Sequence, residues 1–183
     1  MFSTQELENR FSKVSTHPRS FQLKLLCLRK NHPPNTERQV VCEKPIHSCP
    51  PSAELSVEHG LVGDRWQPGD DPGSQITLMD LRVIQTVSPT QDDWHKNGDN
   101  LICDIDLGGE HLMYGSKLQI GKDVIVKVND THHAGCDRFA ARYGKDAVKW
   151  VNSKEGKAKR RRGIKATVIN GGTVRCGDTI QIL

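Results

Sequence analysis

The residue with the clearest chemical potential in this sequence is Cys136, which follows the polar loop Thr131-His132-His133-Ala134-Gly135. The loop joins a strongly β-like segment to a segment with helical periodicity, so we expect Cys136 at a helix N-terminus, near Arg138 and Arg142. The positive end of the helix dipole and both cations favour the thiolate, the form that attacks electrophiles and binds metals. Cys136 is therefore interpreted as a soft metal ligand or a sulfur-transfer thiol. The alternative is a small buried hydrophobe, since free cysteine is among the most buried residue types.

The same loop offers zinc binding as another chemistry. Its histidines and its thiol are potential ligands, and a fourth would come from an upstream group: Cys42, His47 or Cys49. Neighbouring residues of an extended backbone point to opposite sides, so His132 and His133 are poorly placed to bind one ion. A Cys/His hydrolase is weaker still, because no orienting third residue or oxyanion hole is identified. The six cysteines, at positions 27, 42, 49, 103, 136 and 176, form no CxxC pair, and we expect reduced thiols.

A second candidate feature is the turn Gly60-Leu61-Val62-Gly63-Asp64-Arg65-Trp66. Glycine at position 63 permits a backbone conformation that other residues resist. The turn brings an acid and an arginine to the same place. Arg65 is predicted either to pair with Asp64 or another carboxylate, or to bind a phosphate through two hydrogen bonds.

The positive charge of the chain is concentrated in one segment. The formal net charge is +4, but residues 138–165 hold 11 Lys and Arg against 2 acidic residues, which leaves −5 on the remainder. A concentration of this kind can dock an anion. Within it, the run Lys154–Arg162 has three interpretations: a solvated loop, a nucleic-acid patch or a clamp for an anionic ligand. Aromatic residues make up only 5% of the chain, which argues against stacked single-stranded nucleic acid.

Short β-like runs joined by tight turns must position these residues. They predict strands at 21–28, 38–44, 54–58, 101–107, 117–120, 124–128, 164–169, 173–175 and 179–183. Helical spacing predicts a short helix at about 78–87, with Thr77 and Asp80 as its capping box, and a helical stretch from Phe139 to Trp150 that Gly144 interrupts. Many short strands with tight turns are typical of a closed or nearly closed β-barrel. We therefore expect a mostly β fold with a few short helices.

Length and hydropathy bound the domain organisation. The 183 residues suffice for one domain, which we place at 21–183, and residues 1–20 lack sustained periodicity and are predicted to be a loose tail. No apolar run approaches the roughly 20 residues that span a bilayer, and no secretory signal is recognised. We expect a soluble, cytoplasmic protein.

These features occur in an order that resembles the MOSC domain, the module named after the C-terminal part of molybdenum cofactor sulfurase. The resemblance covers roughly residues 21–183. Its segments, in order, are Gly60-Leu61-Val62-Gly63-Asp64-Arg65, Gln75-Ile76-Thr77-Leu78, Asn100-Leu101 with Ile105-Asp106-Leu107, Gly115 with Leu118 and Ile120-Gly121, Cys136, Arg162-Gly163-Ile164, and Gly172, Val174 and Gly177-Asp178. Family members often have Pro before the cysteine and His after the Gly-Asp-Arg sequence, where this chain has Gly135 and Trp66.

The resemblance implies a barrel-like fold that binds the molybdopterin form of molybdenum cofactor, with Cys136 as a persulfide carrier or molybdenum ligand. Together with the charge pattern it indicates a set of cofactor-binding residues: Gly63, Asp64, Arg65, Asn100, His132, His133, Arg138, Arg142 and Arg162. The arginines of this set are candidates to hold the pterin phosphate.

Two versions of the function remain open at this point. One is reduction of N-hydroxylated compounds, as in related molybdenum-dependent members, with electrons from an external electron-transfer partner. The other is cofactor carriage or sulfur relay, supplied by an external sulfur donor such as a cysteine desulfurase. Pyridoxal phosphate is a family-level association only, because no lysine is singled out for a Schiff base, and no cysteine cluster is spaced for an iron–sulfur centre.

The alternatives from other classes are an RNA- or anion-binding barrel that uses the basic run 154–162, and a zinc-stabilised structural protein. We expect no membrane partner, and nucleic acid is the less favoured partner.

Overall fold

The computed structural model describes residues 1–30 and 47–183, and the strand predicted at 38–44 lies outside these ranges. The helices are α1 (Thr4–Ser15), α3 (Leu81–Val87), α4 (Asp137–Tyr143), α5 (Lys145–Asn152) and α6 (Lys154–Ala158), with 3-10 helices η1 (Pro72–Ser74) and η2 (Gln91–Asn97). The strands are β1 (Leu23–Leu26), β2 (Ser52–Ser56), β3 (Gly60–Leu61), β4 (Ile76–Asp80), β5 (Leu101–Cys103), β6 (Lys117–Ile120), β7 (Val124–Val128), β8 (Ile164–Asn170), β9 (Gly172–Arg175) and β10 (Ile180–Ile182). Strands β6 and β7 have the predicted boundaries. No helix within the described ranges is long and apolar enough to cross a bilayer.

The strands form a sheet that closes on itself almost completely. Within the described residues it has seven strands, in the order β1-β5-β4-β8-β7-β6-β10. Only β4 and β5 pair in parallel. The two edges meet, because a bridge joins Gln22 to Thr179 and the Leu23 N–H donates to the Asp178 carbonyl at 2.9 Å. A three-stranded sheet, β3-β2-β9, lies alongside. The predicted mostly β, nearly closed barrel with short helices is confirmed.

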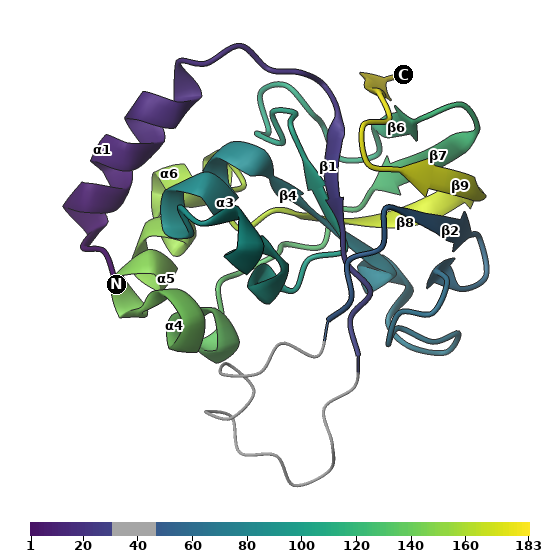
Figure 1. The fold of residues 1–183 in the computed structure, drawn as a ribbon, viewed down its shortest axis with the longest axis horizontal. Coiled ribbons are helices and arrows are strands. Elements are labelled where there is room, and N and C mark those ends of the chain that lie inside the picture. The colour runs from purple at the N-terminus through teal and green to yellow at the C-terminus, as the bar shows by residue number, and fades with distance from the viewer. Residues whose placement is uncertain (31–46) are drawn as a thin grey trace, which may run out of the picture.

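Two apolar cores lie on opposite faces of the central strands β4 and β5. Ile76, Leu78 and Leu101 belong to the barrel interior, whereas Met79 and Ile102 pack with the helices. The change of face from one residue to the next follows from the two-residue period of a strand. Figure 1 shows the helices gathered on one side of the strands, where they cover the outer face of the barrel.

The N-terminal residues form a packed helix, and the loose tail predicted over residues 1–20 is wrong. Ser3 and Glu6 form a capping box at the start of α1, and Leu7 is buried. Glu8 forms an ion pair with Arg161 at 2.7 Å, a contact between residues 153 positions apart. The segment is held by partners distant in sequence, which local periodicity does not show.

The helix predicted at about 78–87 begins later, at Leu81. Residues 76–80 continue as strand β4, and Asp80 in place of Thr77 is the N-cap residue: its carboxylate accepts from the Arg82 N–H at 2.9 Å. By contrast, the predicted break at Gly144 is confirmed. Gly144 separates α4 from α5 with a φ of +93°, a conformation that favours glycine.

Candidate functional site

Cys136 occupies the N-cap position of α4, and its side chain is exposed. The backbone before it is held by Asn152 of α5, which accepts a hydrogen bond from the Gly135 N–H at 2.9 Å and donates one to the Gly135 carbonyl at 3.0 Å. A proline at position 135 would have no N–H and would lose the first bond. The predicted place of Cys136 at a helix N-terminus is confirmed, and α5 fixes the approach of the chain to it.

A cavity of about 140 Å³ lies beside Cys136, and we call it the arginine cavity. Its five arginines come from four segments of the chain, two of them from α4: Arg29, Arg65, Arg138, Arg142 and Arg162. Among the described residues, Asp99 is the one carboxylate on the lining. An excess of guanidinium over carboxylate groups attracts anions and suits phosphate or carboxylate ligands.

Asp64 and Asn100 are not on the cavity lining but hold its residue Arg29 in place. The Asp64 carboxylate accepts from Arg29 Nη2 at 2.7 Å, from the Arg29 N–H at 2.5 Å and from Asn100 Nδ2 at 3.0 Å. Asn100 is fully buried and its Oδ1 accepts from the Thr77 N–H at 3.0 Å. The preceding Gly63 has a φ of +85°, as its glycine-specific turn predicts. Asp64 of the turn motif therefore fixes the position of Arg29, and Asn100 connects the turn to Thr77 of β4.

Arg65 is left without a carboxylate partner among the described residues. Its neighbour Asp64 is committed to Arg29, so the predicted pairing of Arg65 with Asp64 is not formed. Burial lowers the pKa of Arg65, and the nearby positive charges of Arg29 and Arg138 lower it further. An anion bound beside Arg65 would relieve this repulsion, which makes Arg65 a strong candidate to contact one.

Asp99 gathers a second group of side chains at the cavity. It accepts from Arg162 Nη1 at 2.6 Å and from Asn97 Nδ2, and its other oxygen lies 3.8 Å from His133 Nδ1. Burial, followed by the charge of Arg162, lowers the pKa of His133 to about 3, so its imidazole is neutral near pH 7. Asp99 Oδ1, His133 Nδ1 and Arg162 Nε are buried with no hydrogen-bond partner in the described structure. Buried polar atoms without partners are rare and here point to a polar occupant.

The structure brings together only part of the predicted site. Cys136, Arg65, His133, Arg138, Arg142 and Arg162 line the cavity, whereas Gly63, Asp64, Asn100 and His132 do not. His132 is exposed, because it alternates with His133 along an extended loop. Arg29 and Asp99 also line the cavity and were not predicted, and so does His47, which the sequence suggested only as a zinc ligand. Asp99 directly precedes Asn100, a predicted site residue, and this adjacency was a weak signal for it in the sequence. No sequence signal marked Arg29, whose partner Asp64 is 35 positions away.

A further hollow of about 450 Å³ shares Arg29 and Arg65 with the arginine cavity and extends to Trp66. Ligand pockets commonly measure roughly 300–1,000 Å³, so the arginine cavity alone is small for more than an anionic group. Together the two spaces have room for a ligand with an anionic end near the arginines and a larger body beside Trp66.

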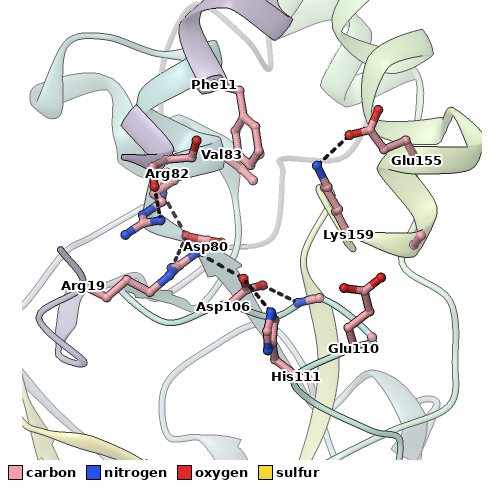
Figure 2. Close-up of a pocket in the computed structure, with 14 residues that line it drawn as sticks. Phe11, Arg19, Asp80, Arg82, Val83, Asp106, Glu110, His111, Glu155 and Lys159 are labelled. Atoms are coloured by element: carbon pink, nitrogen blue, oxygen red, sulfur yellow. Dashed lines mark hydrogen bonds and ion pairs between the residues drawn. The ribbon is translucent and has the colours of Figure 1, made fainter. Parts of the chain in front are cut away.

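A separate cavity of about 390 Å³ lies between α1, α3 and the loop at 106–111 (Figure 2). Asp80 accepts two hydrogen bonds from Arg19, at 3.0 and 2.9 Å, and Lys159 forms an ion pair with Glu155 at 2.6 Å. Burial raises the pKa of Asp80, and the hydrogen bonds from Arg19 act in the opposite direction. We call this space the paired cavity, because its charged groups largely satisfy one another.

The basic run 154–162 is divided between surface and interior. Its lysines are exposed, whereas Arg160, Arg161 and Arg162 are buried. Arg160 Nη1 donates to the Leu112 carbonyl at 2.6 Å, and Arg161 lies over the Trp150 ring at 4.4 Å. The arginines that would form a nucleic-acid patch are thus engaged inside the protein, which disfavours that interpretation.

The zinc interpretation also gains no support from the described part of the chain. No group of three or more His, Cys, Asp or Glu side chains there is arranged to hold a metal ion. Cys42, one of the proposed ligands, lies outside the described residues.

The sequence model of the MOSC domain matches residues 72–181, which include β4 to β9, the start of β10 and the loop of Cys136. The chain belongs to the MOSC domain family. No curated protein matches the sequence significantly.

Solved structures of similar fold include three bacterial proteins. YuaD from Bacillus subtilis aligns with a TM-score of 0.60 at 13% identity, over 88% of this chain and 94% of that one. YiiM from Geobacillus stearothermophilus aligns with a TM-score of 0.59 at 13% identity, over 88% of this chain and 74% of that one. YiiM from Escherichia coli gives 0.54 at 15% identity, over 88% and 69%. At these identities the likeness establishes the MOSC fold alone.

Proposed function

We propose that this MOSC domain protein binds a molybdopterin cofactor in the arginine cavity, with Cys136 as the sulfur that contacts molybdenum. MOSC domains are associated with molybdenum cofactor at the level of the family. The observation that carries the proposal is the pairing of an exposed thiol with five arginines and one carboxylate on a single lining, within the described residues. Thiolates suit soft metals, and guanidinium groups bind phosphate through paired hydrogen bonds.

The residues present fit such a group in charge and in hydrogen bonding. The buried polar atoms without partners, on Asp99, His133 and Arg162, supply both donors and acceptors. The volume of the arginine cavity suits the phosphate end, and the adjoining hollow at Trp66 gives the ring system a place to lie. Aromatic side chains offer a flat apolar surface for such rings.

Each side chain has a distinct task in this proposal. Arg65 and Arg138 have no carboxylate partner in the described structure and would bind the phosphate directly. Arg29 and Arg162 are held by Asp64 and Asp99 and would add positive charge from fixed positions. The metal, when bound, supplies two-electron redox chemistry.

Cys136 supports either of two reactions in this arrangement. As a metal ligand it would serve an enzyme that reduces N-hydroxylated compounds, a reaction that consumes two electrons and two protons and releases water. As a persulfide it would relay sulfur from an external donor. Both need an exposed thiol beside an anion site, so cofactor content and the state of the sulfur have to be measured separately.

The test is elemental and pterin analysis of protein made in a host that synthesises molybdenum cofactor. Wild type is expected to carry near-stoichiometric molybdenum and pterin, and Cys136→Ser to lose most of the molybdenum while keeping its melting temperature. A persulfide-specific label on Cys136 would assign the relay version, and N-hydroxy reductase activity with a reduced dye would assign the enzyme.

The matched control is Cys176→Ser, which changes another exposed cysteine outside the cavity lining. It should keep wild-type cofactor content. Absence of molybdenum and pterin from the wild-type protein, or equal cofactor content in Cys136→Ser and wild type, would contradict the proposal.

A further inference from the structure

Cys27 and Cys49 face each other across two extended segments. Leu28 and Ser48 form an antiparallel bridge in which each N–H donates to the other carbonyl, at 2.9 and 3.2 Å. In an antiparallel ladder the pair next to such a bridge makes no backbone hydrogen bonds to each other, and its Cα atoms are typically about 4.5 Å apart. Cys27 and Cys49 occupy this position beside the Leu28–Ser48 bridge. Disulfides join residues whose Cα atoms are about 4.4–6.8 Å apart. The register alone therefore brings the two cysteines to a separation that a disulfide can bridge.

The two thiols also interact directly and differ in access. Cys27 is 1% exposed, whereas Cys49 is exposed. A hydrogen bond with Cys49, together with burial, raises the pKa of Cys27, and the same hydrogen bond lowers the pKa of Cys49. The exposed thiol of Cys49 is thus the better nucleophile, and the buried thiol of Cys27 lies next to it.

The pair lies next to the arginine cavity. Arg29 and His47, two residues beyond the cysteines on their respective segments, both line it. The Cys27 carbonyl accepts from Asn100 Nδ2 at 3.3 Å, and Asn100 also holds Asp64. A covalent bond between the two segments would brace this wall of the cavity.

We propose that Cys27 and Cys49 form a reversible intramolecular disulfide by exchange with a small disulfide such as oxidised glutathione. The Cys49 thiolate attacks one sulfur of the small disulfide, whose S–S bond breaks and whose other half leaves as a thiolate that takes up a proton. Cys27 then gives its proton to solvent and attacks Cys49 Sγ, which releases the second small thiol. Two protein thiols are oxidised and one small disulfide is reduced to two thiols. The exchange requires no cofactor, so it stands apart from the proposed function.

The experiment incubates the full chain with oxidised glutathione, blocks the remaining thiols and maps the cross-linked peptides by mass spectrometry. Cleavage after Glu43 separates Cys42 from Cys49, so the cross-link can be assigned. The expected result is a peptide pair joining Cys27 to Cys49 and the loss of two free thiols per chain. The melting temperature of the oxidised protein should rise by about 5 °C or more over the reduced protein.

Single variants complete the test. Cys49→Ser changes an exposed residue and should abolish both the cross-link and the rise in melting temperature, and Cys27→Ser should do the same. Cys42→Ser and Cys176→Ser should keep both. The proposal is overturned if the cross-link contains Cys42 or Cys136, if it joins two chains, or if oxidation stops at a mixed disulfide on Cys49.

Discussion

The arginine cavity and the paired cavity contain similar numbers of charged side chains arranged in opposite ways. In the paired cavity, Arg19 is held by Asp80 and Lys159 by Glu155 (Figure 2). In the arginine cavity, Arg65 has no acidic partner in the described structure, and its pKa is lowered by burial and by other cations. The first arrangement balances its charges within the protein, whereas the second leaves positive charge that a bound anion would balance. The contrast lies in charge and not in size, since the paired cavity is larger than the arginine cavity, at about 390 Å³ against 140 Å³.

Removing a carboxylate from the paired cavity should give the largest loss of stability. Asp80→Ala would remove the carboxylate that accepts two hydrogen bonds from the mostly buried Arg19, and it would also remove the N-cap of α3. Breaking a buried ion pair by removing one partner typically costs about 3–5 kcal/mol, and urea denaturation would measure it. Asp106→Ala is the control, because its carboxylate is 44% exposed and 3.8 Å from Arg19, and it should cost about 1 kcal/mol or less. Equal losses in the two variants would show that burial does not decide the strength of these pairs.

Arg162 of the arginine cavity should stabilise the fold through a buried ion pair, as Arg19 does in the paired cavity. Arg162→Ala leaves the buried Asp99 carboxylate with Asn97 and His133 as its remaining neighbours among the described residues, and we expect a loss of about 3 kcal/mol. Adding Asp99→Ala should recover part of this loss, because no unpaired buried charge remains. Arg138→Ala, at an exposed position, should change stability by less than about 0.5 kcal/mol. Additive losses in the double variant would mean that Arg162 and Asp99 are not energetically coupled.

Some of these arginines have an acidic partner and others have none, and this is what the sequence could not predict. The strands at 117–120 and 124–128 and the arginines near Cys136 follow from local pattern and charge. Which arginine is paired depends on contacts such as Arg29 with Asp64, 35 positions apart, that no local pattern encodes. The helix at residues 4–15 was missed although Ser3 and Glu6 give it a local capping-box signal, whereas its ion pair to Arg161, 153 positions away, had no such signal. Local signals thus predicted elements and composition, and tertiary contacts decided pairing.

The neutral His133 should make stability fall in mild acid. Its folded pKa of about 3 lies below the ordinary histidine value, so the unfolded chain binds more protons between about pH 6.5 and pH 3. Stability is therefore present above this window and is lost as the pH falls through it, by about 2 kcal/mol between pH 7 and pH 5. His133→Asn should flatten this part of the profile in urea denaturation at several pH values. An unchanged slope in the variant would show that His133 titrates normally in the folded protein.

The smallest effect on stability, and the one that separates the two cavities most sharply, is expected at Arg65. Because Arg65 has no acidic partner among the described residues and is repelled by Arg29 and Arg138, Arg65→Ala should change stability by less than about 0.5 kcal/mol without anion. Inorganic pyrophosphate should stabilise wild type by about 1.4 kcal/mol at ten times its Kd, and most of this gain should be lost in Arg65→Ala. Lys159→Ala in the paired cavity and Arg175→Ala at an exposed position of β9 should keep the gain. If Lys159→Ala loses it while Arg65→Ala keeps it, the anion binds in the paired cavity, and the contrast between compensated and uncompensated charge does not identify the site.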